Sequence, residues 1–126
     1  MSGILIDTSV WIDHFRRSNE SLANLMALDR ILIHPMIIGE IACGTPPNRS
    51  KTINDLALFV QVRQATVNEV VSFIEREQLF GLGCGFVDLS LLASTILTPN
   101  ARLWSMDKRL RSLAAKFKVA YQPAVH

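Results

Sequence analysis

Short apolar runs alternate along the chain with longer segments in which apolar residues recur at helical spacing. The runs at residues 4–6 and 31–33 are continuous rather than alternating, which is typical of parallel strands that are covered on both faces. We predict further strands at residues 59–62, 101–105 and 119–121. The pattern therefore predicts up to five strand segments that are spread along the whole chain.

Helix signals fill the intervals between these strands. Thr8 and Ser9 offer N-cap side chains for a helix that begins near Val10, and Thr66 with Glu69 forms the pattern of a capping box. Two further helices are predicted after Asn19 and after Thr66, and the second of these ends near residue 77. The remaining predicted helices cover residues 35–44, 50–58, 86–97 and 108–116. Strands separated by helices predict an α/β fold with a mostly parallel sheet of four to five strands and helices on both faces.

The composition indicates a folded protein in a reducing compartment. The 126 residues are 49% hydrophobic and 19% charged, which excludes the disordered and fibrous classes and favours a single domain over residues 1–126. Cys43 and Cys84 have neither the spacing of a zinc site nor that of a disulfide framework. The most apolar segment, residues 86–97, is interrupted by Asp88 and is too short to span a membrane. We therefore expect a cytoplasmic protein that does not enter a membrane.

Four acidic residues stand in apolar surroundings, where an ordinary solvated surface is not expected. Asp7 follows the first strand and Asp107 follows the fourth, whereas Glu40 and Asp88 lie in predicted helices. Because the carboxyl ends of parallel strands meet at one edge of a sheet, Asp7 and Asp107 should lie on the same edge. Each acid also has a structural alternative, since the three aspartates could cap or complement a helix N-terminus and Glu40 could pair within the fold.

Convergence of these four carboxylates would require a cation. Two carboxylates about 4 Å apart repel by roughly 4 kcal/mol at an effective dielectric constant near 20, which is a large fraction of the stability of a domain. A ligand set of oxygen atoms, with no cluster of His or Cys nearby, favours Mg²⁺ or Mn²⁺ over zinc. Such an ion generates hydroxide from water and stabilises the leaving oxygen of a phosphate ester. The matching chemistry is hydrolysis of phosphodiester bonds.

Four segments of the chain resemble motifs of the PIN-domain ribonucleases, and particularly of the VapC toxins of toxin-antitoxin systems. These segments are residues 4–13, 38–44, 85–93 and 103–110. The resemblance implies a three-layer α/β/α domain in which Asp7, Glu40, Asp88 and Asp107 bind Mg²⁺ or Mn²⁺ and carry out RNA cleavage. Ser105 departs from the threonine usual two positions before the last acid, but it keeps the hydroxyl group. The resemblance also implies a homodimer and a VapB-type antitoxin as partner.

Basic residues gather near the last of these acids. Residues 101–118 contain six Lys or Arg and one acid, Asp107. A solvated helix face is one explanation, but cations beside a metal site would also hold the phosphate backbone of RNA across the acids. The residues assigned to RNA binding are Lys108, Arg109 and Arg111. The residues assigned to hydrogen bonds that orient the acids or the attacking water are Thr8, Ser9 and Ser105.

The sequence leaves two other classes of function open. A phosphatase that uses Asp7 as its nucleophile would carry a second acid two residues later, where this chain has Ser9. A non-catalytic RNA-binding or interaction module would not need all four acids, and a metal titration would separate it from an enzyme. The most specific hypothesis is a metal-dependent endoribonuclease that resembles the VapC toxins.

Overall fold

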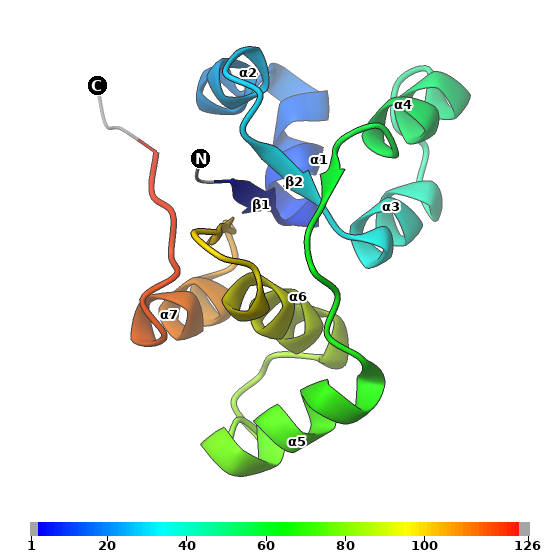
Figure 1. Cartoon of the computed structure of the whole chain (residues 1–126). Helices are drawn as coiled ribbons and strands as arrows, with labels where there is room; N and C mark the ends of the chain where they lie inside the picture. Colours follow the sequence, from blue (N-terminus) through cyan, green and yellow to red (C-terminus); the bar gives the residue numbers. More distant parts are fainter. Residues whose placement is uncertain (1–2, 124–126) are drawn as a thin grey trace.

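A parallel β-sheet forms the centre of the protein in the computed structural model, which describes residues 3–123 (Figure 1). Its strands, in chain order, are β1 (Ile4–Ile6), β2 (Ile31–Ile33), β3 (Val60–Gln61) and β4 (Arg102–Trp104). Their order across the sheet is β3-β2-β1-β4, and each neighbouring pair is parallel. β1 is therefore paired on both sides, with β2 on one side and β4 on the other.

Helices pack in two groups around this sheet. Their bounds are α1 (Thr8–Arg17), α2 (Glu20–Ala27), α3 (Pro35–Ala42), α4 (Arg49–Leu56), α5 (Val67–Glu77), α6 (Phe86–Leu97) and α7 (Lys108–Lys116). The helices α1, α3 and α4 pack in succession, whereas α6 contacts α5, α7 and β4 (Figure 1). Right-handed crossovers put α1 to α4, which lie between β1 and β3 in the chain, on one face of the sheet. They put α5 and α6, which lie between β3 and β4, on the other face. The predicted α/β/α architecture is confirmed.

The structure corrects two of the predicted elements. The first helix begins at Thr8 and not near Val10, with Asp7 at its N-cap. The hydroxyl groups of Thr8 and Ser9 do not cap this helix, because both donate to carboxylates instead. The strand predicted at residues 119–121 is reduced to a single parallel bridge between Ala120 and Leu103, on the free side of β4.

Elements with strong terminal signals follow the prediction closely. The bounds of α6 and α7 agree with it, and α5 begins with the predicted capping box between Thr66 and Glu69. The segment between Pro47 and Val62 agrees less well, since its helix ends at Leu56 and its strand contains only Val60–Gln61. A capping side chain marks the first turn of α5 and of α7, whereas α6 begins after Gly85 and is defined by its apolar spacing.

The centre of the core is formed by β1, β2 and α6. The three residues of β1 are fully buried, and β2 is buried along its whole length, as expected for strands with helices on both faces. In α6, Leu91 and Leu92 are fully buried, and the Thr95 hydroxyl donates to the Leu91 carbonyl at 2.8 Å. Within residues 3–123, none of the helices has the length and apolar character that crossing a membrane requires.

Shortening a side chain of the central strand should destabilise the fold. Leu5 is fully buried in β1, so Leu5→Ala should lower the free energy of unfolding by about 2–5 kcal/mol through lost burial and a residual cavity. Leu58→Ala is the matched control, because Leu58 is 83% exposed, and it should change stability by less than about 0.5 kcal/mol. Urea denaturation measures both values, and equal stability of the two variants would contradict this account of the core.

Candidate functional site

The predicted acids lie around the point where the strand order of the sheet reverses. From β1 the chain proceeds to β2 and β3 in one direction, and it then returns past β1 to β4. The carboxyl ends of β1 and β4 border the crevice in which parallel α/β proteins bind their ligands. Asp7 directly follows β1, and Ser105 and Asp107 follow β4. The fold thus brings together residues that are about a hundred positions apart in the chain.

Asp7 is held in this crevice by the strand on one side and by two serines on the other. Its amide donates to the Trp104 carbonyl at 2.9 Å, which continues the β1–β4 pairing by one hydrogen bond. The hydroxyl groups of Ser9 and Ser105 both donate to Asp7 Oδ2 at 2.8 Å. Asp7 is only 6% exposed, and these bonds compensate for the burial of its carboxylate.

The same two serines fix the chain segment that follows β4. The Met106 amide donates to Ser9 Oγ, and the Asp107 amide donates to Ser105 Oγ, both at 3.0 Å. Each hydroxyl therefore accepts from the backbone and donates to Asp7. This arrangement ties the loop after β1 to the loop after β4 and sets the position of Asp107.

Glu40 reaches the site from α3. Its Oε1 accepts a hydrogen bond of 2.7 Å from Thr8 Oγ1, across the contact between α1 and α3. The apolar sequence around Glu40 suggested a buried acid, but the residue is exposed on the outer side of an otherwise apolar helix. Thr8 is thus the partner of Glu40, and the bond places this acid beside the first turn of α1.

Asp88 lies in the first turn of α6, where the charges of the other three acids act on its carboxyl group. Partial burial raises the pKa of its carboxyl, and the negative charges of Asp7, Asp107 and Glu40 raise the pKa further, while the Gly85 amide lowers it. The charges of Asp7, Asp107 and Glu40 are therefore each close enough to act on Asp88 at this edge of the sheet.

Asp107 also has the structural role that the sequence left open. It is the N-cap of α7, and its Oδ1 accepts from the Leu110 amide at 3.0 Å. Capping uses one carboxylate oxygen, and the negative charge still raises the pKa of Asp88. His34, which follows β2 at the same edge, is a cap as well, since its Nδ1 accepts from the Met36 amide and burial lowers its pKa.

The donor set of these acids fits a hard divalent cation. Asp7, Glu40 and Asp107 each use one carboxylate oxygen in the hydrogen bonds above, which leaves Asp7 Oδ1, Glu40 Oε2 and Asp107 Oδ2 available. In the described part of the chain, however, no three His, Cys, Asp or Glu side chains converge as a preformed metal site. Cation binding would have to draw the carboxylates closer together than they stand.

The three basic residues assigned to RNA lie on different flanks of α7. Lys108 and Arg109 line a hollow beside the loop that precedes α6, whereas Arg111 does not. The basic residues of α1 also separate, because Arg16 lines a hollow together with Glu40 and Arg17 pairs with Asp13 at 2.6 Å. Arg16 therefore shares a hollow with Glu40, and Lys108 and Arg109 directly follow Asp107 in the chain.

Sequence reasoning missed the contribution of the glycine-rich loop at residues 81–85. It predicted only a flexible connection, but the Arg109 side chain packs directly on Gly83. The Cys84 thiol is also near the acids, since burial and the charges of Asp88 and Asp107 raise its pKa while Arg109 lowers it. The alternation of Gly81, Gly83 and Gly85 was the available signal, because it indicates close approach to a neighbouring group.

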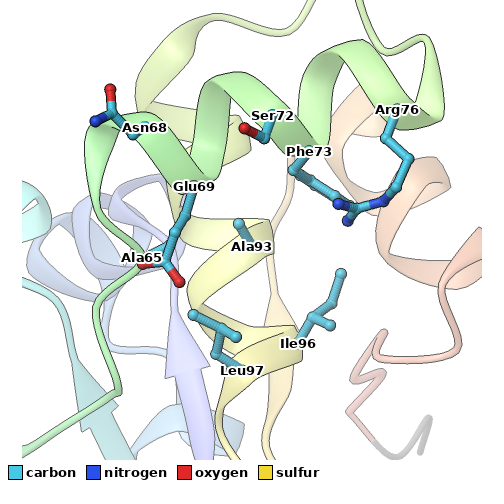
Figure 2. Close-up of a pocket in the computed structure, with 9 residues that line it drawn as sticks. All are labelled: Ala65, Asn68, Glu69, Ser72, Phe73, Arg76, Ala93, Ile96 and Leu97. Atoms are coloured by element: carbon cyan, nitrogen blue, oxygen red, sulfur yellow. The ribbon is translucent and has the colours of Figure 1, made fainter.

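A second hollow lies between α5 and α6 and contains none of the four acids (Figure 2). It has a volume of about 380 Å³, and its two charged side chains, Glu69 and Arg76, already have structural partners. Glu69 accepts from the Thr66 amide as part of the capping box, and the Arg76 guanidinium lies 5.8 Å from the centre of the Phe73 ring. This hollow therefore carries no catalytic arrangement.

Comparison with known proteins identifies the family of the chain. Over 117 residues it is 41% identical to Ribonuclease VapC32 of Mycobacterium tuberculosis, in the strains CDC 1551 / Oshkosh and ATCC 25618 / H37Rv. The match covers 93% of this chain and 94% of each relative. This chain belongs to the VapC family of PIN-domain ribonucleases. No protein-family model matches it.

The raised pKa of Asp88 predicts how stability depends on pH. The folded chain binds this proton more readily than the unfolded chain, so ionised Asp88 lowers stability above its raised pKa. Asp88→Asn should therefore raise the Tm at pH 7, and the gain should disappear as the pH falls below about 4, where Asp is protonated in the unfolded chain too.

Asp55→Asn is the control for this measurement, because Asp55 lies in an exposed pair with Lys51 at 2.7 Å. It should change the Tm little at either pH. Calorimetry of the three proteins between pH 3 and pH 8 makes the comparison. A lower Tm of Asp88→Asn at pH 7 would contradict the assigned repulsion.

Proposed function

We propose that the chain is a metal-dependent endoribonuclease and the toxin of a VapBC-type pair, acting in the cytoplasm. The observation that carries this proposal is that the charges of Asp7, Glu40 and Asp107 all act on Asp88 beside the reversal point of the sheet. Repulsion among these carboxylates favours binding of a cation, and family membership supports RNA as the substrate.

The four acids would hold Mg²⁺ or Mn²⁺, which when bound supplies hydroxide from water and stabilises the leaving oxygen. Ser9 and Ser105 hold Asp7 Oδ2 by hydrogen bonds. The carboxylate is therefore fixed, and its other oxygen, Oδ1, keeps a defined direction. Thr8 restrains Glu40 in the same way. Because the nucleophile is water and not the RNA 2′-hydroxyl, the products should carry a 5′-phosphate and a 3′-hydroxyl.

A small protein partner would regulate this open site. The hollow between α1 and the segment after α3 has a volume of about 430 Å³ and is lined by Ile12, Phe15, Arg16, Glu40 and Pro46 among others. An antitoxin segment could place apolar side chains in this hollow and a Lys or Arg against Glu40. Family membership also supports a homodimer, for which exposed apolar residues of α5 and α6, such as Val71 and Ile96, offer a surface.

The phosphatase alternative loses support at Ser9. In such an enzyme the second acid after the nucleophile would serve as a proton donor, whereas the Ser9 hydroxyl donates to Asp7 Oδ2 itself. The non-catalytic alternative is decided by activity, because it predicts RNA binding without cleavage in any divalent metal.

Replacing the central acid should remove activity and leave the fold intact. Asp7→Asn removes one ligand charge but keeps an oxygen that can accept from Ser9 and Ser105, so RNA cleavage in Mn²⁺ should fall to background at an unchanged Tm. Asp29→Asn is the control, because Asp29 lies before β2 at the opposite edge of the sheet, at φ 56°, which Asn adopts readily.

Induced expression in a bacterial host extends this test to toxicity. Wild type and Asp29→Asn should arrest growth, and Asp7→Asn should not. Equal growth arrest by all three proteins would show that toxicity does not depend on the acids. Full cleavage by Asp7→Asn would contradict the proposed site.

The hydroxyl of Ser105 should matter for activity more than its size. Ser105→Ala removes the donor to Asp7 and the acceptor of the Asp107 amide, so cleavage should fall by about 10–100-fold and require more Mn²⁺. Ser105→Thr keeps the hydroxyl and should retain most of the activity. Cleavage rates measured against Mn²⁺ concentration check both variants, and an inactive Ser105→Thr at normal stability would contradict the assigned role.

A further inference from the structure

A hollow lies between the loop that precedes α6 and the first turns of α7. It is a shallow, open hollow with a volume of about 370 Å³. Its lining combines two cations, one hydroxyl and two leucines: Leu82, Lys108, Arg109, Ser112 and Leu113. Leu82 is 47% exposed and so places apolar surface beside the cations. This combination suits a ligand that carries both a phosphate and a sugar or ring.

The Arg109 side chain is held across the backbone of Gly83. Its Nη1 donates to the Gly83 carbonyl at 3.4 Å. A Cβ atom at Gly83 would lie 2.7 Å from Arg109 Nη1 and 2.8 Å from Arg109 Cδ, closer than non-bonded carbon atoms approach. Gly83 also has a φ of +86°, which favours glycine. The missing side chain at this position is therefore what allows Arg109 to lie along the loop.

The hollow adjoins the acids of the crevice. Lys108 and Arg109 directly follow Asp107, the N-cap of α7. The thiol of Cys84, next to Gly83, lies within electrostatic reach of Arg109 as well as of Asp88 and Asp107. A nucleotide in the hollow would thus be a neighbour of the phosphodiester held at the acids.

Helix geometry separates Arg109 from Arg111. Successive residues of an α-helix are rotated by roughly 100°, so Arg109, Ser112 and Leu113 share one flank of α7. The buried residues of the helix are Leu110, Leu113 and Ala114, which puts Arg111 on the opposite flank. Arg111 carries the same charge as Arg109 at nearly the same position along the helix axis, but it does not line the hollow.

We propose that this hollow binds one nucleotide of the RNA next to the cleaved bond, with its phosphate on Arg109 and Lys108, and that Gly83 positions Arg109 for this contact. The proposal rests on the proposed function and deepens it, because it replaces a diffuse basic rim by a defined subsite. It also divides the three assigned RNA-binding residues, with Arg111 outside the subsite.

The first arm of the test compares two arginines of the same helix. Binding of a fluorescein-labelled single-stranded RNA is measured by anisotropy without divalent cations, so that the result does not depend on cleavage. Arg109→Gln should raise the Kd about tenfold, as expected for loss of a charge-assisted contact, and reduce the salt slope by about 0.7. Arg111→Gln should leave both nearly unchanged, and equal effects of the two variants would overturn the subsite.

The second arm compares two glycines of the same loop. Gly81 has a φ of +72° but open space around its Cβ position, whereas a Cβ at Gly83 collides with Arg109. Gly81→Ala and Gly83→Ala therefore carry similar backbone strain, and a positioning role predicts weaker RNA binding for Gly83→Ala alone. Combined with Arg109→Gln, Gly83→Ala should have no further effect on the Kd. Equal binding by the two alanine variants, or an additive effect in the combination, would overturn the positioning role.

Cleavage by the wild-type protein in Mn²⁺ separates this proposal from the proposed function. RNA binding with the expected difference between Arg109 and Arg111, but no cleavage, would support the subsite and contradict the nuclease. Cleavage with no such difference would support the nuclease and overturn the subsite. Absence of both RNA binding and cleavage by the wild type would overturn both.

Discussion

The pairing of β1 with β4 is the contact on which the rest of the site depends. It joins the first of these strands to the last, and it ends in a hydrogen bond from the Asp7 amide to the Trp104 carbonyl. Beyond this bond the two chains diverge, and the serines at 9 and 105 fill the space between them with hydroxyl groups aimed at Asp7. The crevice is thus a direct product of strand order, because no other pair of strand ends in this sheet flanks the reversal point.

Opposite charges are distributed around this crevice in an ordered way. Burial and then the charges of the other acids raise the pKa of Asp88, and the neutral serines and Thr8, rather than cations, hold Asp7 and Glu40. Arg109 is held aside by Gly83 and does not form an ion pair with any acid of residues 3–123. The carboxylates therefore remain available to a divalent ion while a cation stands beside them for a phosphate.

Much of the fold, and the position of Asp7 and Asp107 at one edge of the sheet, could be predicted from sequence, because both depend on local signals. Continuous apolar runs marked the buried strands, and the capping groups of α5 and α7 marked their first turns. The predicted start of α1 was wrong for a physical reason: Thr8 and Ser9 have the side chains of N-cap residues, but the Thr8 hydroxyl donates to Glu40, and the Ser9 hydroxyl donates to Asp7 and accepts from the Met106 amide. A local pattern cannot contain a partner that lies 32 residues away, as Glu40 does from Thr8.

The serine bonds also have a consequence for the sheet itself. Side chains alternate between the two faces of a strand, so a slip of β4 by one residue would exchange every position on its faces. Such a slip would bring Trp104 or Met106 opposite Asp7 in place of Ser105, and neither can donate a hydroxyl hydrogen bond to the buried carboxylate. Asp7 therefore favours the native strand register. A misaligned β4 would leave this buried negative charge without one of its hydrogen-bond donors during folding.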